Sequence, residues 1–107
     1  MLAIPIQIIK FVEAHQPNIV ECAMIDFAGT EFRFVGKTYD FTSAYLDEHS
    51  QYPQPGLIPC HALKEWSDEK GRSVTTIDTN QPPMFIEATT GQIQFNVFTN
   101  QLTNITL

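Results

Sequence analysis

Apolar and polar residues alternate with a period of two through most of this chain, in short segments. Ile4, Ile6 and Ile8, for example, are separated by Pro5 and Gln7. Successive side chains of a β-strand point to opposite faces of a sheet, so this period is typical of strands with one buried face. A helix would repeat its apolar residues every three or four positions instead. The alternation therefore predicts a mainly β protein.

Turn residues separate the alternating segments and predict antiparallel pairing. Ala-Gly-Thr at 28–30, Asp-Glu-Lys-Gly at 68–71 and Thr-Thr-Gly at 89–91 each join two strand-like segments, as in hairpins. The last of these hairpins would pair Met84–Ala88 with Gln92–Thr99. We expect a single β-rich domain over residues 1–107, built as one antiparallel β-sandwich or strongly twisted sheet of about seven strands.

Three places depart from simple alternation. Pro5 has no backbone N–H to donate to a neighbouring strand, which predicts that the first strand lies at an edge of the sheet. The alternation slips at residues 25–27, which predicts a bulge or burial on both faces. Potential capping residues before Ala44-Tyr45-Leu46 predict one short helix near Thr42–His49.

The inward-facing positions of the expected strands predict the hydrophobic core. They are Ile6, Ile8, Val20, Cys22, Met24, Phe32, Phe34, Ile58, Cys60, Trp66, Val74, Ile86, Ile93, Phe95 and Val97. Both cysteines of the chain fall in this set. The N-terminal segment has no basic region and no small-residue cleavage site, so we expect a cytoplasmic protein with two buried free thiols.

The sequence lacks the spacing patterns of the common catalytic and cofactor sites. His15, His49 and His61 are too far apart in the chain to form a known metal motif, and no glycine-rich phosphate loop is present. Cys60 and His61 are adjacent, but neighbours on a strand point to opposite faces, and Cys22 lies on an apolar strand face. No serine lies in the G-x-S-x-G pattern of a nucleophile elbow. We therefore expect no metal, no cofactor and no enzymatic activity.

The charge balance argues against nucleic acid, and the hydropathy pattern argues against a membrane. Six Lys and Arg stand against twelve Asp and Glu, and the net charge is −6. Six cationic side chains can neutralise only a few backbone phosphates. We therefore expect no nucleic-acid binding. No apolar run approaches the roughly 20 residues that cross a bilayer.

An acidic, tyrosine-rich segment is the candidate binding surface. Residues 38–63 contain no Lys or Arg. We predict partner contacts from Asp40, Tyr45, Asp47, Glu48 and Tyr52, because tyrosines are frequent interface anchors and carboxylates pair with a partner's basic residues. A second interpretation stays open, in which the aromatic side chains cover one end of the sheet and the acids only maintain solubility. The turn at 68–71 is the fallback location for an interface.

Two resemblances bear on function. Tyr52-Pro53-Gln54-Pro55-Gly56, Trp66-Ser67-Asp68 and Ile77-Asp78-Thr79 form a spaced set, with Gln16-Pro17 and Val20-Glu21-Cys22 before it, that is similar to a group of small uncharacterised bacterial proteins. The size, acidity and lack of catalytic motifs also resemble the immunity proteins of contact-dependent growth inhibition and other polymorphic toxin systems. That resemblance implies a cytoplasmic antidote that blocks the active site of one cognate toxin domain, a basic RNase or DNase.

Two alternatives belong to other functional classes. A small-molecule-binding β-domain, or an enzyme with dispersed residues, would use Tyr45, Tyr52, His49 and His61 around a concave pocket. A structural or adaptor protein would self-associate through the edge strand expected at Pro5. Binding of a metabolite would support the first alternative, and a concentration-dependent oligomer would support the second.

Overall fold

Two long, bent strands organise the fold. The computed structural model describes residues 1–106, and in it β1 (Leu2–Glu13) and β4 (Gln54–Ser67) pair antiparallel over residues 2–8 and 54–60. Beyond that shared stretch the two strands diverge. The far half of β1 pairs with β2 (Ile19–Ile25), and the far half of β4 pairs with β5 (Ser73–Asp78). One sheet is thereby folded into two layers.

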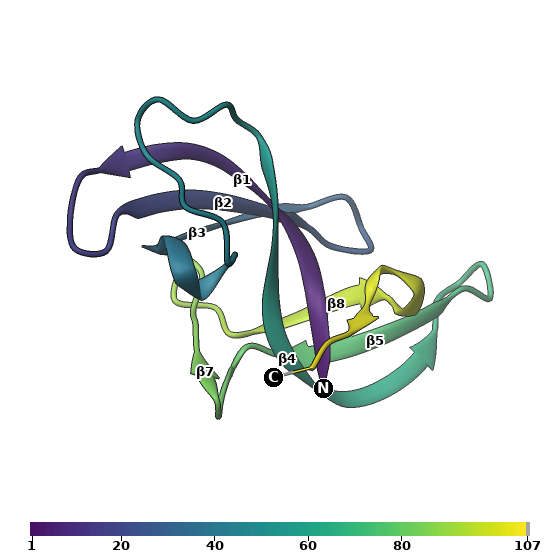
Figure 1. The fold of residues 1–107 in the computed structure, drawn as a ribbon. Coiled ribbons are helices and arrows are strands. Elements are labelled where there is room, and N and C mark those ends of the chain that lie inside the picture. The colour runs from purple at the N-terminus through teal and green to yellow at the C-terminus, as the bar shows by residue number, and fades with distance from the viewer. Residues whose placement is uncertain (107) are drawn as a thin grey trace.

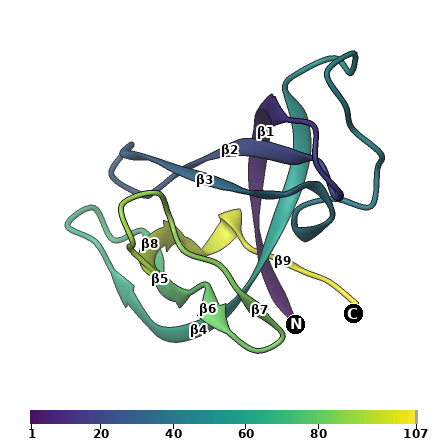
Figure 2. The same cartoon turned by 90° about the vertical axis from the view of Figure 1, so that its left-hand side faces the viewer.

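The remaining strands complete the sheet in the order β3-β2-β1-β4-β5-β8. These are β3 (Glu31–Lys37), β8 (Gln94–Phe98) and the short β9 (Thr103–Asn104), which pairs with the start of β1. Figures 1 and 2 show β2 and β3 as one layer and β5 and β8 as the other, connected by β1 and β4. The predicted mainly β, antiparallel fold of about seven strands is confirmed.

Contacts between the two layers close the curled sheet. The backbone N–H of Phe27, after β2, donates to the Asn96 carbonyl of β8 at 3.0 Å, and the Gln101 amide donates to the Ile25 carbonyl at 3.0 Å. Gln101 belongs to the 3-10 helix η2 (Thr99–Gln101), which follows β8. No helix in residues 1–106 is long and apolar enough to cross a membrane.

The core lies between the layers, and most of it was predicted. Phe95, 2% exposed on β8, packs edge-on against Phe32 with ring centroids 5.0 Å apart and also contacts Phe34 at 5.7 Å. Every predicted core residue is buried except Phe32, Trp66 and Ile93, which are partly exposed. The apolar core side chains missing from the predicted set are Ala3, Ile4, Phe41, Leu46, Ile77 and Ala88.

The prediction that Pro5 marks an edge strand is wrong. β1 lies inside the sheet, where Pro5 pairs with Leu57 of β4. The Leu57 N–H donates away from β1, to the Phe41 carbonyl at 2.9 Å, so this pair requires no N–H from the proline. On its other side, Pro5 lies between the residues paired with β9, which end at Ala3, and those paired with β2, which begin at Gln7.

The expectation of a bulge or of burial on both faces at residues 25–27 is also wrong. The β2–β3 ladder is regular to its end at Ile25, which is 47% exposed on the outer face. The strand ends there because the Asp26 carboxylate accepts the backbone N–H groups of Ala28 and Thr30 and begins the turn. Irregular register occurs instead in β1 after Ile8 and in β4 after Ala62, where bulges accompany the bends.

The predicted last hairpin does not form as a ladder. β7 (Met84–Phe85) pairs with β6 (Asn80–Gln81) in a separate small hairpin, and β8 pairs with β5. The Asp78 carboxylate accepts the Asn80 N–H at 2.8 Å and the Gln81 amide at 2.9 Å, which turns the chain directly after β5. The hairpins expected at 28–30 and 68–71 are present.

Candidate functional site

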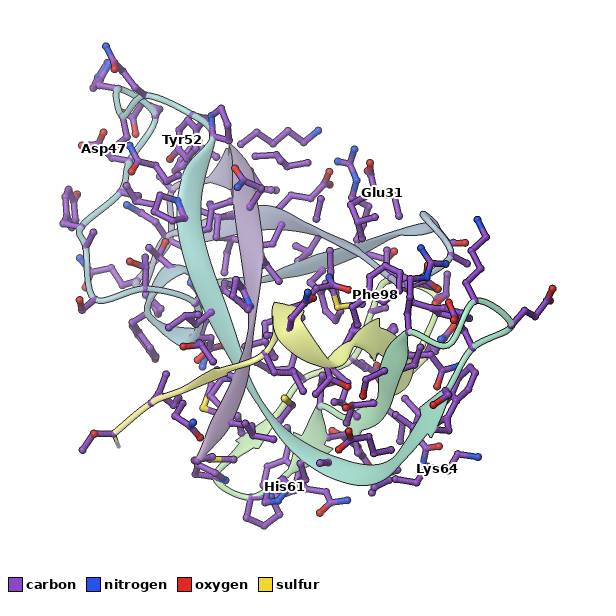
Figure 3. All side chains as sticks on the ribbon, turned by 90° about the vertical axis from the view of Figure 1, so that its right-hand side faces the viewer. Glu31, Asp47, Tyr52, His61, Lys64 and Phe98 are labelled. Atoms are coloured by element: carbon purple, nitrogen blue, oxygen red, sulfur yellow. The ribbon has the colours of Figure 1, made fainter. Side chains whose placement is uncertain are left out.

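The candidate site is formed by residues 38–53, called here the β3–β4 loop. All five predicted partner-binding residues belong to it: Asp40, Tyr45, Asp47, Glu48 and Tyr52. Figure 3 shows Asp47 and Tyr52 at one end of the molecule, with His61 and Lys64 at the opposite end. The molecule measures 44 Å along its longest axis. The loop is therefore well separated from the β4–β5 turn that was the fallback location.

The short helix predicted near Thr42–His49 is absent, and the placement was wrong. The loop begins with the 3-10 helix η1 (Thr38–Asp40) and then has no helix before β4. The Thr42 hydroxyl accepts the Ala44 N–H at 3.1 Å, and the Asp47 carboxylate accepts the His49 N–H at 2.9 Å. Side chains that satisfy nearby backbone N–H groups compete with helix formation.

Two apolar side chains attach the loop to the core. Phe41 and Leu46 are each 4% exposed. The Phe41 ring lies close over β3, since a Cβ atom at Gly36 would come within 3.2 Å of it. The sequence analysis missed both residues because they belong to no alternating segment. Their one signal was that they are apolar in an otherwise polar stretch.

Asn18, in the connection between β1 and β2, fixes the loop from the other side. Its side-chain N–H donates to the Leu46 carbonyl at 3.0 Å, and its side-chain oxygen accepts the His15 N–H at 3.2 Å. The Asn18 carbonyl accepts both the N–H and the hydroxyl of Thr38, each at 2.9 Å. One asparagine thereby joins two loops, a role that the sequence analysis did not predict.

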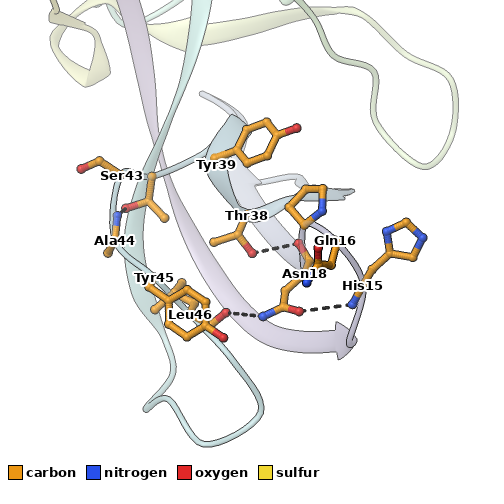
Figure 4. Close-up of a pocket in the computed structure, with 11 residues that line it drawn as sticks. His15, Gln16, Asn18, Thr38, Tyr39, Ser43, Ala44, Tyr45 and Leu46 are labelled. Carbon is orange, nitrogen blue, oxygen red and sulfur yellow. Dashed lines mark hydrogen bonds between the residues drawn. The ribbon is translucent and has the colours of Figure 1, made fainter.

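A groove of about 670 Å³ lies between the two loops. Residues 15–18, 38–39 and 42–46 line it, and Figure 4 shows Tyr39 and Tyr45 toward opposite ends with Thr38 and Asn18 between them. Tyr39 is 62% exposed and Tyr45 is 79% exposed. Of the five predicted contact residues, only Tyr45 lines this groove. The sequence analysis mentioned Tyr39 as part of the acidic segment but did not propose it as a contact.

The other predicted contact residues have different surroundings. The Tyr52 hydroxyl donates to the Asp47 carbonyl at 2.8 Å while its ring packs against the core, so Tyr52 supports the loop from within. Glu48 is exposed, and one of its oxygens lies 3.5 Å from Nε2 of His49. Burial raises the pKa of the half-buried Asp40 carboxyl, and the nearby Lys37 only partly counters this.

Both arginines of the chain are paired with its own acids. The Arg33 guanidinium contacts Glu21 at 2.6 Å and also pairs with Glu31. Near the β4–β5 turn, Arg72 contacts Asp68 at 2.7 Å and lies over the Phe98 ring at 4.7 Å. A second cavity of about 570 Å³ adjoins this arginine.

The two cysteines are buried and free, as predicted. Burial, together with the nearby Glu21 charge, raises the pKa of Cys22 to about 12, and burial raises the pKa of Cys60 to about 11. Both groups therefore stay protonated near neutral pH, where a thiol is a poor nucleophile.

The histidines do not converge in the structure. His15 lines the groove, His49 lies beside Glu48, and Nε2 of His61 is 2.7 Å from the Pro82 carbonyl oxygen. Across residues 1–106, His, Cys, Asp and Glu side chains form no group of three or more that could hold a metal ion. The site therefore offers aromatic faces, hydroxyl groups and carboxylates.

Comparison with known proteins gives no match: no family model, no curated protein and no solved structure is similar to this chain.

Proposed function

We propose that this protein is an immunity protein that binds and neutralises a cognate toxin domain. The single observation that carries the proposal is the presentation of two tyrosines, 62% and 79% exposed, on a hydrogen-bonded loop without any Lys or Arg. The partner is a basic, nuclease-type domain of bacterial origin, and the antidote acts in the cytoplasm. Binding covers the basic active site of that domain, and no catalysis by the antidote is needed.

The physical basis is preorganisation combined with charge complementarity. Asn18, Phe41 and Leu46 hold the loop backbone before any partner arrives, so binding orders few additional torsions. Tyrosines contribute a large contact area at a low cost in side-chain entropy. A net charge of −6 attracts a basic domain over long range and increases the association rate.

The acids and the tyrosines of the loop have different roles in the proposed binding. Asp40, Asp47 and Glu48 meet Lys or Arg side chains of the toxin, whose phosphate-binding cleft requires such residues. Tyr45 supplies contact area on the exposed surface of the loop, and Tyr52 acts mainly by holding Asp47 in place through their 2.8 Å hydrogen bond.

The test compares two double variants that each remove two negative charges. Asp47→Asn with Glu48→Gln changes the loop, and Glu69→Gln with Glu87→Gln changes exposed acids outside it. The partner is the candidate toxin domain encoded next to this gene, and affinity is measured by calorimetry at two salt concentrations. We expect at least about a tenfold loss for the loop variant and less than about a threefold loss for the control.

Equal losses in the two double variants would mean that only net charge matters. A partner whose affinity responds neither to salt nor to the loop variant would contradict the proposal, and the interface would then be sought at the β4–β5 turn.

The groove gives a second candidate function some support. Its volume of about 670 Å³ falls within the range of small-molecule sites, and it combines aromatic and hydroxyl side chains. A metabolite that raises the melting temperature, with the effect lost in Tyr45→Ala, would favour this alternative. Self-association through the first strand is not proposed, because β1 is paired with β4 and β2.

A further inference from the structure

We propose that the groove between the β1–β2 connection and the β3–β4 loop is a binding site for an arginine side chain of the partner. This inference rests on the proposed function and names the group that enters the site. The guanidinium would enter the groove that Tyr39 and Tyr45 line, with its N–H groups directed at oxygen atoms of the groove wall.

The walls provide the aromatic faces that a guanidinium prefers. Tyr39 and Tyr45 are the two tyrosines of the groove, and both expose most of their surface to solvent. The face of a tyrosine ring attracts a cation, and the planar guanidinium also stacks on it. Nζ of Lys37 already lies 6.0 Å from the centroid of the Tyr39 ring, so this face attracts a cation from within the chain.

The polar groups of the groove are suited to a donor-rich ligand. The side chains of Gln16, Ser43 and Tyr45 each carry an oxygen that can accept a hydrogen bond. Guanidinium has five N–H donors and no acceptor, so it can use these oxygens, although the same side chains also carry O–H or N–H donors. The lining contains no Lys or Arg, which disfavours an anionic ligand.

The acids of the β3–β4 loop also favour a cation over an anion in the groove. Asp40 follows Tyr39 directly in η1, and burial raises the pKa of its carboxyl, which the nearby Lys37 only partly counters. Asp47 and Glu48 follow the groove residue Leu46 in the chain. These three carboxylates do not line the groove, but they belong to the same loop as its tyrosines and add negative charge to that end of the molecule.

The chain itself contains an arrangement of the kind proposed. Arg72 contacts the Asp68 carboxylate at 2.7 Å while its guanidinium lies 4.7 Å from the Phe98 ring centroid. An aromatic face and an acid together hold an arginine at that position. The groove presents aromatic faces and nearby acids, and the arginine would come from the partner.

The experiment uses the whole protein and a small probe, so it needs no toxin. N-acetyl-arginine-N-methylamide is titrated and followed by NMR, with the neutral citrulline analogue as a matched control. We expect saturable shifts at Tyr39, Tyr45 and Asn18, and at least about a fivefold weaker response to citrulline, because the cation–π attraction requires charge. The lysine analogue should bind more weakly than the arginine analogue.

Two tyrosine variants, one control and one lysine variant locate the site. Tyr39→Leu and Tyr45→Leu should each weaken arginine binding at least about fivefold, because each removes one aromatic face. Phe85→Leu is the matched control, since Phe85 is an aromatic residue of similar exposure, 68%, on β7 outside the groove. Lys37→Gln should strengthen binding, because it removes the cation that lies nearest to the Tyr39 ring.

Shifts spread over the acidic surface and equal for arginine and citrulline would overturn the inference. So would saturable binding that is unchanged in both tyrosine variants. Failure of the arginine titration, combined with loss of toxin binding in the Asp47→Asn, Glu48→Gln protein, would leave the proposed function intact and move the contact out of the groove. Arginine binding in the groove without toxin binding would support the arginine site and contradict the proposed function.

Discussion

The two ends of the molecule use the same kinds of residue with opposite results. At the β4–β5 turn, Asp68 is paired with Arg72, whose guanidinium also covers the Phe98 ring. At the β3–β4 loop, acids and aromatic residues occur together again, but residues 38–53 include no Lys or Arg, and Nζ of Lys37, the nearest cation along the chain, lies 6.0 Å from the centroid of the Tyr39 ring. Tyr45 is 79% exposed. At the first end, an arginine of the chain itself contacts the acid and the aromatic ring. At the second end, the acids and tyrosines have no such arginine, and we propose that a partner supplies it.

The pKa shifts of two aspartates express the same difference. Burial alone would raise the pKa of Asp68, but hydrogen bonds from the backbone and guanidinium of Arg72 and from the Lys70 N–H hold it below its ordinary value. Burial raises the pKa of Asp40, and Lys37 compensates only in part. The fold therefore favours the charged form of the first acid and disfavours the charged form of the second.

The largest effect on stability is expected at Phe95, which packs in the core between the two layers. Phe95 contacts Phe32 and Phe34 across the two layers. Phe95→Ala should lower the free energy of unfolding by about 3–5 kcal/mol, since it leaves a cavity in the shared core. Urea denaturation followed by fluorescence measures the change. A loss below about 1 kcal/mol would show that the packing between the layers is not as described.

The next variant separates the two ends. Asn18→Asp keeps the acceptor for the His15 N–H but removes the donor to the Leu46 carbonyl and places a charge beside it. We expect a cost of about 1–3 kcal/mol, confined to the loop. Hydrogen exchange should accelerate at residues 38–46 and stay unchanged at residues 68–72. Uniform acceleration would indicate that Asn18 supports the whole fold.

The strands could be predicted from sequence because their signal is local. Alternation at Val20, Cys22 and Met24 places a strand and its buried face without any knowledge of its partners. The central position of β1 could not be predicted in this way. Pro5 is tolerated inside the sheet because Leu57 directs its N–H to Phe41, and that arrangement depends on residues far away in the chain.

One wall of the candidate site could be predicted from local sequence, and the other wall could not. The acids and tyrosines of residues 38–53 were visible as composition and predicted a binding surface, which stays a prediction, whereas the short helix expected near Thr42–His49 was wrong. The opposite wall of the groove was not visible. Asn18 and Leu46 are 28 positions apart, and no periodic pattern connects an asparagine after a proline to a carbonyl in another loop.

A pH titration sharpens the comparison between the two aspartates. The folded pKa of Asp68 lies below its ordinary value of 3.8, so its ionised form stabilises the fold above about pH 4, and this stability is lost as the pH falls through the folded pKa. The folded pKa of Asp40 lies above 3.8, so its ionisation costs stability once the pH rises through that folded value.

The expected outcome is a pair of opposite changes in melting temperature at pH 7. Asp68→Asn should lower it, Asp40→Asn should raise it slightly, and both differences should shrink as the pH falls toward 3. Melting is followed by circular dichroism from pH 3 to 7. Changes of the same sign in both variants would remove the electrostatic distinction between the two ends.

The smallest effect on stability is expected at the residue with the largest proposed role in binding. Tyr45 is 79% exposed, so Tyr45→Ser should change the free energy of unfolding by less than about 0.5 kcal/mol. Phe98→Ser is the contrasting variant and should cost about 1–3 kcal/mol, because Phe98 packs edge-on against Phe27 at 6.2 Å and lies under Arg72. Urea denaturation compares the two. If Tyr45→Ser were as costly as Phe98→Ser, the tyrosine would already be contributing to the fold as Phe98 does. We expect a side chain that serves as an anchor for a partner to contribute little to the free energy of unfolding of the free protein. That outcome would therefore remove Tyr45 from the proposed interface.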